Sequence, residues 1–165
     1  MNVNGSARPA VEALGAASYT GTDMRDGPGV DVVCAAEDLP ARFGASSADV
    51  VVCTEMLEHA EDWQAAMSGM ITILKPGGVL LLTTRSEGFP RHGYPDDHWR
   101  FSVPSMAWIL GAAGLIAERC EPDSDLNAPG VFALARKPGS WHAPNGRLRP
   151  AAWDTAGVTS MGWVK

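Results

Sequence analysis

Two short segments hold most of the residue types that take part in chemistry. The first is TEMLEH at 54–59, which directly follows the apolar run VVVC and supplies two acids, a hydroxyl and an imidazole. The second is FPRHGYPDDHWR at 89–100, which contains two histidines, two aspartates and two arginines. Imidazole titrates near neutral pH and a carboxylate can orient it, so this composition is suited to proton transfer.

In the second segment, His92 or His98 is a candidate proton acceptor, and Asp96 or Asp97 would orient the ring. An arginine there, Arg91 or Arg100, is suited to holding an anionic ligand. The spacing of these histidines and aspartates matches no closed zinc pattern, so we expect no metal site.

Each segment also has a purely structural interpretation. Residues 85–100 are then a structural loop, with Tyr94 and Trp99 buried as anchors. Glu58 and His59 then only begin a helix, where an acid is stabilising without any ligand.

The surrounding pattern alternates strands with helices. We expect strands at 19–22, 30–34, 48–53 and 79–84, and a final antiparallel hairpin formed by 116–121 and 131–136. Continuous β-branched runs are typical of strands buried on both faces, and we expect this of 48–53. The two main helices should begin after Asp62 and Ser102, which would serve as their N-caps. The first helix should end at Pro76–Gly77–Gly78 and the second near Ala113.

This order predicts an α/β three-layer sandwich with a mostly parallel sheet. Ligands of such sheets bind beyond the carboxyl ends of the strands, and both polar segments follow strands there. We expect one domain at 1–137 and an irregular tail at 138–165, which packs on the domain through its tryptophans.

Composition bounds the function further. The chain has 165 residues, is 45% hydrophobic and carries a formal net charge of −6, which gives no indication of a broad basic face for nucleic acid. Its three cysteines form no CxxC pair, the N-terminus lacks a signal-peptide apolar region, and the aliphatic run 79–82 is too short to span a bilayer. We therefore expect a cytoplasmic protein without membrane or nucleic-acid partners, and leave homo-oligomerisation open.

Two stretches carry a family resemblance. YTGTDMRDGPGVDVVCAAEDLP resembles a strand with an acidic end followed by the next strand and its turn. ADVVVCTEMLEHAEDWQAAMSGMITILKPGGVLLLTT resembles the fourth strand, a helix, and the LKPGG turn into the fifth strand. Over about 4–137 the chain resembles the class I S-adenosylmethionine-dependent methyltransferases, of the small-molecule, type 11-like group. The resemblance implies a Rossmann-like fold and S-adenosylmethionine as cofactor.

The resemblance also implies roles for individual residues. Asp23 matches the acid that accepts hydrogen bonds from the cofactor ribose, and Met24 matches a residue that packs on adenine. The other residues implied to contact the cofactor are Gly5 in the glycine-rich loop, Ala36, Glu37, Asp38 and Leu39 around adenine, and Thr54, Glu55 and His59 near the methionine part. The catalytic residues expected in the loop after the fifth strand are His92, Asp97 and His98.

The chain departs from the family pattern at two places. Ala35 stands where the family usually has an acid, so backbone amides would carry that contact. The chain begins MNVNGSARP, so only the end of the glycine-rich loop is present and the first, central strand is absent. Either the gene encodes that strand upstream, which we favour, or the chain is a degenerate relative, or the flanking strands close up or receive a strand from another chain. As given, the chain should bind the cofactor weakly or not at all.

The predicted function is methyl transfer from S-adenosylmethionine to a small-molecule or sugar-like acceptor. The alternative is a noncatalytic methyltransferase-like binding or structural protein that has lost the cofactor loop.

Overall fold

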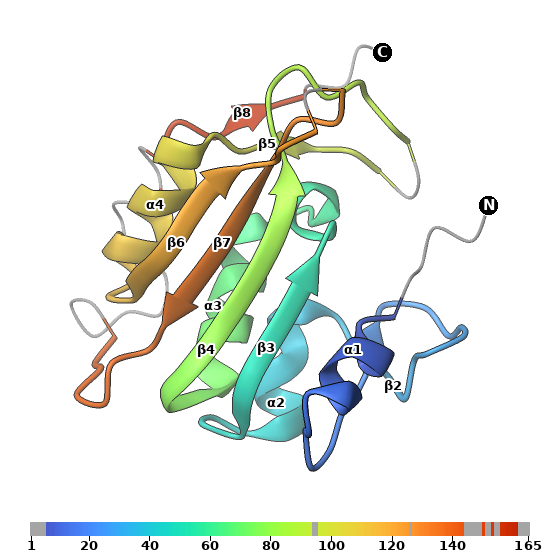
Figure 1. The fold of residues 1–165 in the computed structure, drawn as a ribbon, viewed down its shortest axis with the longest axis vertical. Coiled ribbons are helices and arrows are strands. Elements are labelled where there is room, and N and C mark those ends of the chain that lie inside the picture. The colour runs from blue at the N-terminus through green and yellow to red at the C-terminus, as the bar shows by residue number, and fades with distance from the viewer. Residues whose placement is uncertain are drawn as a thin grey trace.

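A four-stranded sheet forms the centre of the computed structural model, which describes residues 6–93, 96–125, 127–143, 150, 153 and 156–161. Its strand order is β3 (Ala48–Thr54), β4 (Leu74–Arg85), β7 (Gly130–Arg136) and β6 (Ile116–Pro122) (Figure 1). β3 and β4 run parallel, with Thr54 opposite Thr83, so their carboxyl ends lie at the same edge of the sheet. β6 and β7 form the expected antiparallel hairpin, and the α/β Rossmann-like fold class is confirmed.

One face of this sheet carries the hydrophobic core. Helices α3 (Trp63–Ile73) and α4 (Val103–Ala112) lie against it (Figure 1). Their buried side chains meet those of alternate strand residues; among the largest in this core are Met67, Met70, Leu80, Leu82, Ile109 and Leu110. On the other face Leu81 is 39% exposed and Phe132 is 42% exposed, so the described residues leave that face largely open.

Both helix starts follow the sequence prediction. Asp62 Oδ1 accepts from the backbone N–H groups of Gln64 and Ala65, and Ser102 Oγ accepts from that of Ser105. The end of α3 differs, because the helix stops at Ile73 and Leu74 is already extended. The buried ammonium of Lys137 donates to the carbonyls of Ile71 and Leu74, at 2.8 and 2.7 Å, and satisfies groups that a helix end leaves unpaired.

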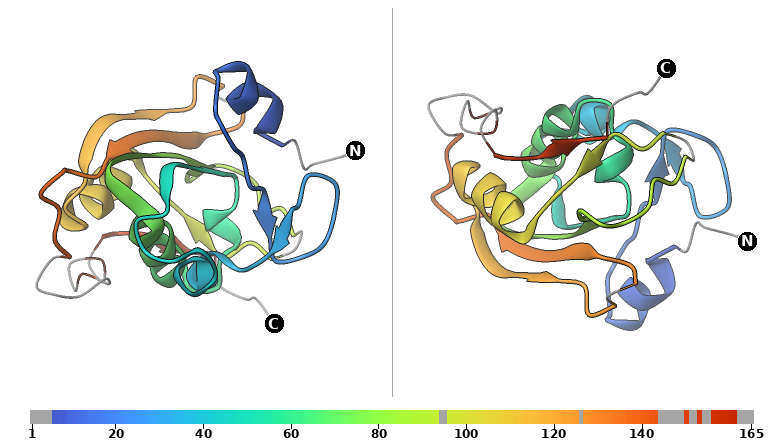
Figure 2. Two further views of the ribbon diagram at one scale, coloured as in Figure 1. Left: turned by 90° about the horizontal axis from the view of Figure 1, so that it is seen from below. Right: turned by 90° about the horizontal axis from the view of Figure 1, so that it is seen from above.

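The expectation that 48–53 is buried on both faces is wrong. β3 is the edge strand of the described sheet, and Val50 is 55% exposed, whereas Cys53 is 5% exposed. The short strands β1 (Thr22–Asp23) and β2 (Val32–Val33) pair in parallel with each other only, within the part of the chain that the structure describes. β1 and β3 are the strands that would flank the expected central strand. In the described residues they do not pair with each other, so they do not close up (Figure 2).

The segment after β2 is held against α3 by a close backbone approach. It consists of the 3-10 turn η1 (Ala36–Asp38) and the short helix α2 (Leu39–Phe43). A Cβ built on Gly69 of α3 would lie 2.0 Å from the carbonyl oxygen of Ala36, so only glycine lets the two backbones meet. Gly69 thereby fixes the position of the η1 turn.

The remaining described elements are short helices and strands outside the central sheet. α1 (Arg8–Ala13) precedes β1, and the 3-10 turn η2 (Leu57–His59) follows β3. After residue 137, Trp153 is 1% exposed, and the Trp141 indole donates to the carbonyl of Ala113 at 2.8 Å. β8 (Thr159–Ser160) pairs with β5 (Trp99–Arg100). None of the helices described is both long and apolar enough to cross a bilayer.

Candidate functional site

The two polar segments meet beyond the carboxyl ends of β3 and β4. Glu58 and His59 belong to η2, directly after β3, and His92 and Asp97 belong to the loop after β4. Because the two strands are parallel and adjacent, the loops that leave them are brought side by side. The ring centroids of His59 and His92 are 4.7 Å apart, in an edge-to-face arrangement.

Asp97 anchors the second of these loops. Its carboxylate is buried and pairs with the equally buried guanidinium of Arg100, whose Nη2 lies 2.6 Å from Oδ2. The backbone N–H of His92 donates to the same oxygen at 2.9 Å. Burial by itself raises the pKa of the Asp97 carboxyl, but the hydrogen bonds from Arg100 and His92 outweigh burial and lower it to about 2. Arg100 is thereby committed to Asp97 and is not placed to hold an anionic ligand.

His92 is oriented by that carboxylate. Its Nδ1 lies 3.1 Å from Asp97 Oδ2, and its ring also packs edge-on against Phe89. Burial lowers the pKa of His92, Asp97 opposes this, and His59 and Arg100 lower it further. The net shift is downward, so the neutral imidazole is favoured near neutral pH.

His59 is held from the other side of the cluster. Its Nδ1 bonds to the carbonyl oxygen of Asp96, which leaves Nε2 facing Glu58 Oε1 at 3.9 Å. Because a carbonyl can only accept, Nδ1 must carry the proton and Nε2 must be the unprotonated nitrogen of the neutral ring.

Glu58 is the most deeply placed acid of the cluster, at 0% exposure. Oε2 accepts from the Thr84 hydroxyl at 2.8 Å, whereas Oε1 has no hydrogen-bond partner among the described residues. Burial is the main cause that raises the pKa of this carboxyl, and the charge of Glu55 adds to it. Hydrogen bonding from its own backbone and from Thr84, together with His59, opposes the rise.

Glu55 turns back onto β4 instead of pointing outward. Its φ of +52° is in the left-handed region, which is unusual for a residue with a side chain. Oε1 accepts from the Thr83 hydroxyl at 2.7 Å, and Oε2 pairs with Arg85. The strained turn at Glu55 thus redirects the chain from β3 into η2.

The residues predicted to bind the cofactor lie on two separate parts of the structure. Asp23 and Met24 are exposed at the end of β1, and Asp23 Oδ1 accepts from the backbone N–H of Arg25 at 2.9 Å. In η1, Ala36 is half-buried and Glu37 and Asp38 are exposed. Leu39 is 6% exposed and packs in the hydrophobic core, so it is not open to a ligand. Gly5 lies outside the described residues.

The backbone of His98 is held by two hydrogen bonds. The backbone N–H of His98 donates to the carbonyl of Glu58 at 2.9 Å, and its carbonyl accepts from Met161 at 2.7 Å. The first bond ties the loop after β4 to η2, and the second ties it to the residue that follows β8. Sequence reasoning treated Glu58 only as an acid near a helix start and did not single out Thr84. The sequence feature that could have indicated Glu58 and Thr84 is that each is a polar residue close to an apolar run.

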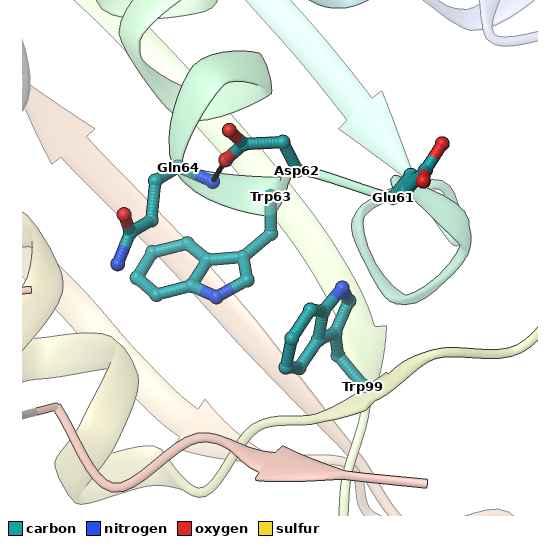
Figure 3. A pocket seen from close by; sticks show the side chains of 5 residues that line it. All are labelled: Glu61, Asp62, Trp63, Gln64 and Trp99. Carbon is teal, nitrogen blue, oxygen red and sulfur yellow. Dashed lines mark hydrogen bonds between the residues drawn. The ribbon is translucent and has the colours of Figure 1, made fainter. Parts of the chain in front are cut away.

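The structure also has a pocket of about 300 Å³, lined by Glu61, Asp62, Trp63, Gln64 and Trp99 (Figure 3). Two of these residues are close in sequence to the cluster, since Glu61 follows His59 by two positions and Trp99 follows Asp97 by two. The Trp99 indole donates to the carbonyl of Ala60 at 2.8 Å, which fixes one wall. None of the residues predicted to bind the cofactor lines this pocket.

Comparison with known proteins identifies the domain. A family model described as a methyltransferase domain matches residues 9–116. A ubiquinone biosynthesis O-methyltransferase from Idiomarina loihiensis is 38% identical over 88 residues, which cover 53% of this chain and 33% of the relative. One from Xanthomonas axonopodis is 50% identical over 48 residues, covering 29% and 20%. The matched region therefore spans at most about a third of these two curated relatives.

Solved structures show the same fold at low identity. The 1,6-didemethyltoxoflavin-N1-methyltransferase of Burkholderia thailandensis has a TM-score of 0.58 and 16% identity, covering 72% of this chain and 60% of that one. An S-adenosylmethionine-dependent methyltransferase from Mesorhizobium loti has a TM-score of 0.55 and 16% identity, covering 79% and 85%. With the family model matching most of its length, the chain belongs to the methyltransferase domain family.

Proposed function

We propose that this domain transfers a methyl group from S-adenosylmethionine to an oxygen atom of a small-molecule acceptor, at the cluster beyond β3 and β4. The observation that carries this proposal is the placement of His92, which Asp97 orients and which lies against His59. The oxygen acceptor is supported by the names of the curated relatives, which are O-methyltransferases of ubiquinone biosynthesis. A sugar-like hydroxyl is a second acceptor that fits the same chemistry.

The residues present fit the adenosine part of the cofactor. Asp23 is exposed at a strand end, and its Oδ2 has no hydrogen-bond donor among the described residues, so it can accept from a ribose hydroxyl. The exposed η1 turn, fixed by Gly69, offers its backbone to the adenine edge. Thr54, at the end of β3, is exposed and lies between these groups and the cluster along the chain.

When bound, the cofactor supplies an electrophilic methyl group, so the protein has to align the acceptor and remove its proton. His92 can take that proton at Nε2, because its Nδ1 faces the Asp97 carboxylate and the ring is otherwise neutral. Asp97 keeps its negative charge and stabilises the imidazolium that results. The acceptor oxygen would gain the methyl group as the sulfur–methyl bond of the cofactor breaks and S-adenosylhomocysteine leaves, and His92 would carry away the hydroxyl proton.

One structural observation favours the alternative, a noncatalytic binding protein. The β1–β2 pair, which carries Asp23, shares no strand pairing with β3 in the described residues. The two halves of a cofactor site would then rest on separate sheets, and a ligand could bind without being aligned for transfer.

A radiometric assay tests the proposal. The purified chain is incubated with methyl-labelled S-adenosylmethionine and a panel of catechol-type and sugar hydroxyl acceptors, beside His92→Ala and the control His142→Ala, whose exposed side chain lies outside the cluster. We expect transfer to at least one acceptor, reduced about 100-fold or more in His92→Ala and unchanged in the control. Absence of transfer to every acceptor, with or without cofactor binding, would overturn the proposal and support the noncatalytic alternative.

A further inference from the structure

We propose that Glu58, His59 and His92 form a binding site for one divalent transition-metal cation, of which zinc is the best match. One ligand atom from each of the three side chains lies within 4.8 Å of the other two. Two imidazoles and one carboxylate are a donor set that zinc and iron prefer, whereas magnesium and calcium favour oxygen donors.

The buried carboxylate of Glu58 is the first independent observation that points to a ligand. The side chain is 0% exposed, and Oε1 has no hydrogen-bond donor among the described residues. Because a buried oxygen without a partner is costly, native structures normally satisfy it with a donor, a water or an ion. Oε1 faces His59 Nε2 at 3.9 Å, so its open side is directed into the cluster.

Both histidines are oriented as metal ligands usually are. A ligating imidazole typically donates its second ring N–H to a carbonyl or carboxylate, which fixes the ring and raises its basicity. His59 Nδ1 bonds to the carbonyl of Asp96, and His92 Nδ1 lies 3.1 Å from the carboxylate of Asp97. The His59 bond leaves Nε2 as the nitrogen with a free lone pair, whereas His92 Nδ1 faces Asp97 without a hydrogen bond among the described residues.

The three ligand atoms, which all lie within 4.8 Å of one another, would have to move closer together to hold a cation. Zinc bonds of about 2.0–2.2 Å in a tetrahedral arrangement place two ligand atoms about 3.4 Å apart. The 3.9 Å between His59 Nε2 and Glu58 Oε1 exceeds this by a few tenths of an ångström, which a side-chain rotation supplies. Three protein ligands would leave one position open, as in catalytic rather than structural zinc sites.

Three ligands from two loops also explain why sequence spacing did not reveal the site. Glu58 and His59 are adjacent, and their third partner follows a whole helix and strand later. The chain order therefore contains no short metal motif.

The metal site goes beyond the proposed methyl transfer and does not depend on it. A cation on His92 Nε2 would prevent that nitrogen from taking a proton, and a hydroxyl bound at the open position would instead be acidified by the cation. Metal binding is measurable without cofactor or acceptor, so its failure is distinguishable from failure of the methyl transfer.

The test uses the tag-free, chelator-treated full chain and titrates it with zinc in a calorimeter and with cobalt in an absorption spectrometer. We expect one cation per chain with a dissociation constant in the micromolar range or below, and visible cobalt bands of a four- or five-coordinate site. Glu58→Gln, His59→Ala and His92→Ala should each weaken zinc binding at least 10-fold. His142→Ala and Glu61→Gln, both at exposed residues outside the three ligands, should bind as the parent does.

Circular dichroism of each variant distinguishes loss of the metal site from loss of the fold. Because His92 is half-exposed, His92→Ala should be the substitution that the fold tolerates most easily. Zinc binding that is absent from the parent, or equally strong in a folded His92→Ala and the parent, would overturn the proposal.

Discussion

The buried carboxylate of Asp97 receives hydrogen bonds from Nη1 and Nη2 of Arg100, three residues further along the chain. The same guanidinium donates to the backbone carbonyls of Phe89 and Pro90. One ion pair thus joins both ends of the loop after β4, and His92 lies between them. Asp97 and Arg100 therefore set the position of the His92 ring, and neither has to contact a ligand to do so.

Breaking this pair should destabilise the fold strongly. Asp97→Asn removes the charge that compensates a buried guanidinium, and we expect a loss of about 3–5 kcal/mol in the free energy of unfolding. Urea denaturation followed by tryptophan fluorescence measures it. Asp96→Asn, at an exposed neighbour, is the control and should change stability by less than about 0.5 kcal/mol. A loss below 1 kcal/mol in Asp97→Asn would mean that the pair does not organise the loop.

Local features of the fold were predictable because they depend on neighbours in the chain. The caps at Asp62 and Ser102, the 116–121 and 131–136 hairpin, and the strand at 79–84 all follow from residues a few positions apart. The predicted end of α4 near Ala113 is local as well, because the next residue, Gly114, adopts a φ of +74°, which glycine reaches readily. In each case a single backbone or side-chain preference decides the structure.

Features that depend on the pairing of distant segments were not predictable. Composition marked 48–53 as buried, but whether a strand is central depends on what pairs with its other edge. The sequence offers Arg91 or Arg100 as an anion ligand, because the partner of Arg100, Asp97, is recognisable only once the loop is closed. The burial of Glu58 beneath Thr84 likewise depends on the β3–β4 register.

Gly69→Ala should separate the η1 turn from α3. The added Cβ would lie 2.0 Å from the Ala36 carbonyl oxygen, and because that atom is backbone, the turn has to move. We expect a loss of about 1–3 kcal/mol in stability, together with weaker cofactor binding. Gly111→Ala is the matched control, since a Cβ there meets nothing within 4 Å and alanine favours the helix by about 0.5–1 kcal/mol. If both variants were stabilised, the close approach would not be a constraint.

Cys53 should be inert to alkylation in the folded protein. Burial raises the pKa of its thiol to about 12, and the charges of Glu58 and Glu55 add to the effect. Because only the thiolate reacts, raising the pH from 7 to 9 should not increase labelling at Cys53, whereas in urea it should react as an ordinary cysteine. Mass spectrometry after iodoacetamide treatment identifies the labelled residue. Labelling of folded Cys53 that rises with pH would show that this end of β3 opens to solvent.

Asp23→Ala should weaken the binding of S-adenosylmethionine. The substitution removes a charged acceptor for the ribose hydroxyls, which corresponds to about 1.5–3 kcal/mol of binding free energy. Asp26→Ala, at another exposed aspartate three residues after Asp23, should leave the affinity unchanged. Calorimetric titration of the cofactor measures both. Equal affinity in Asp23→Ala and the parent would exclude the ribose role.

Trp153→Ala tests whether the segment after residue 137 belongs to the folded domain. The Trp153 ring packs on Trp63 with centroids 5.5 Å apart, and its indole N–H donates to the carbonyl of Ile109 at 2.9 Å. Since the side chain is 1% exposed, its truncation should leave a cavity between α3 and α4 and cost about 3–5 kcal/mol of stability. Thermal denaturation compares this variant with Trp108→Ala, a removal of the same side chain where it is 54% exposed, which should cost far less. Equal small losses in the two variants would make the segment a dispensable tail. A large loss confined to Trp153→Ala would make it part of the core that supports the start of α3, and with it the loop that carries Glu58 and His59.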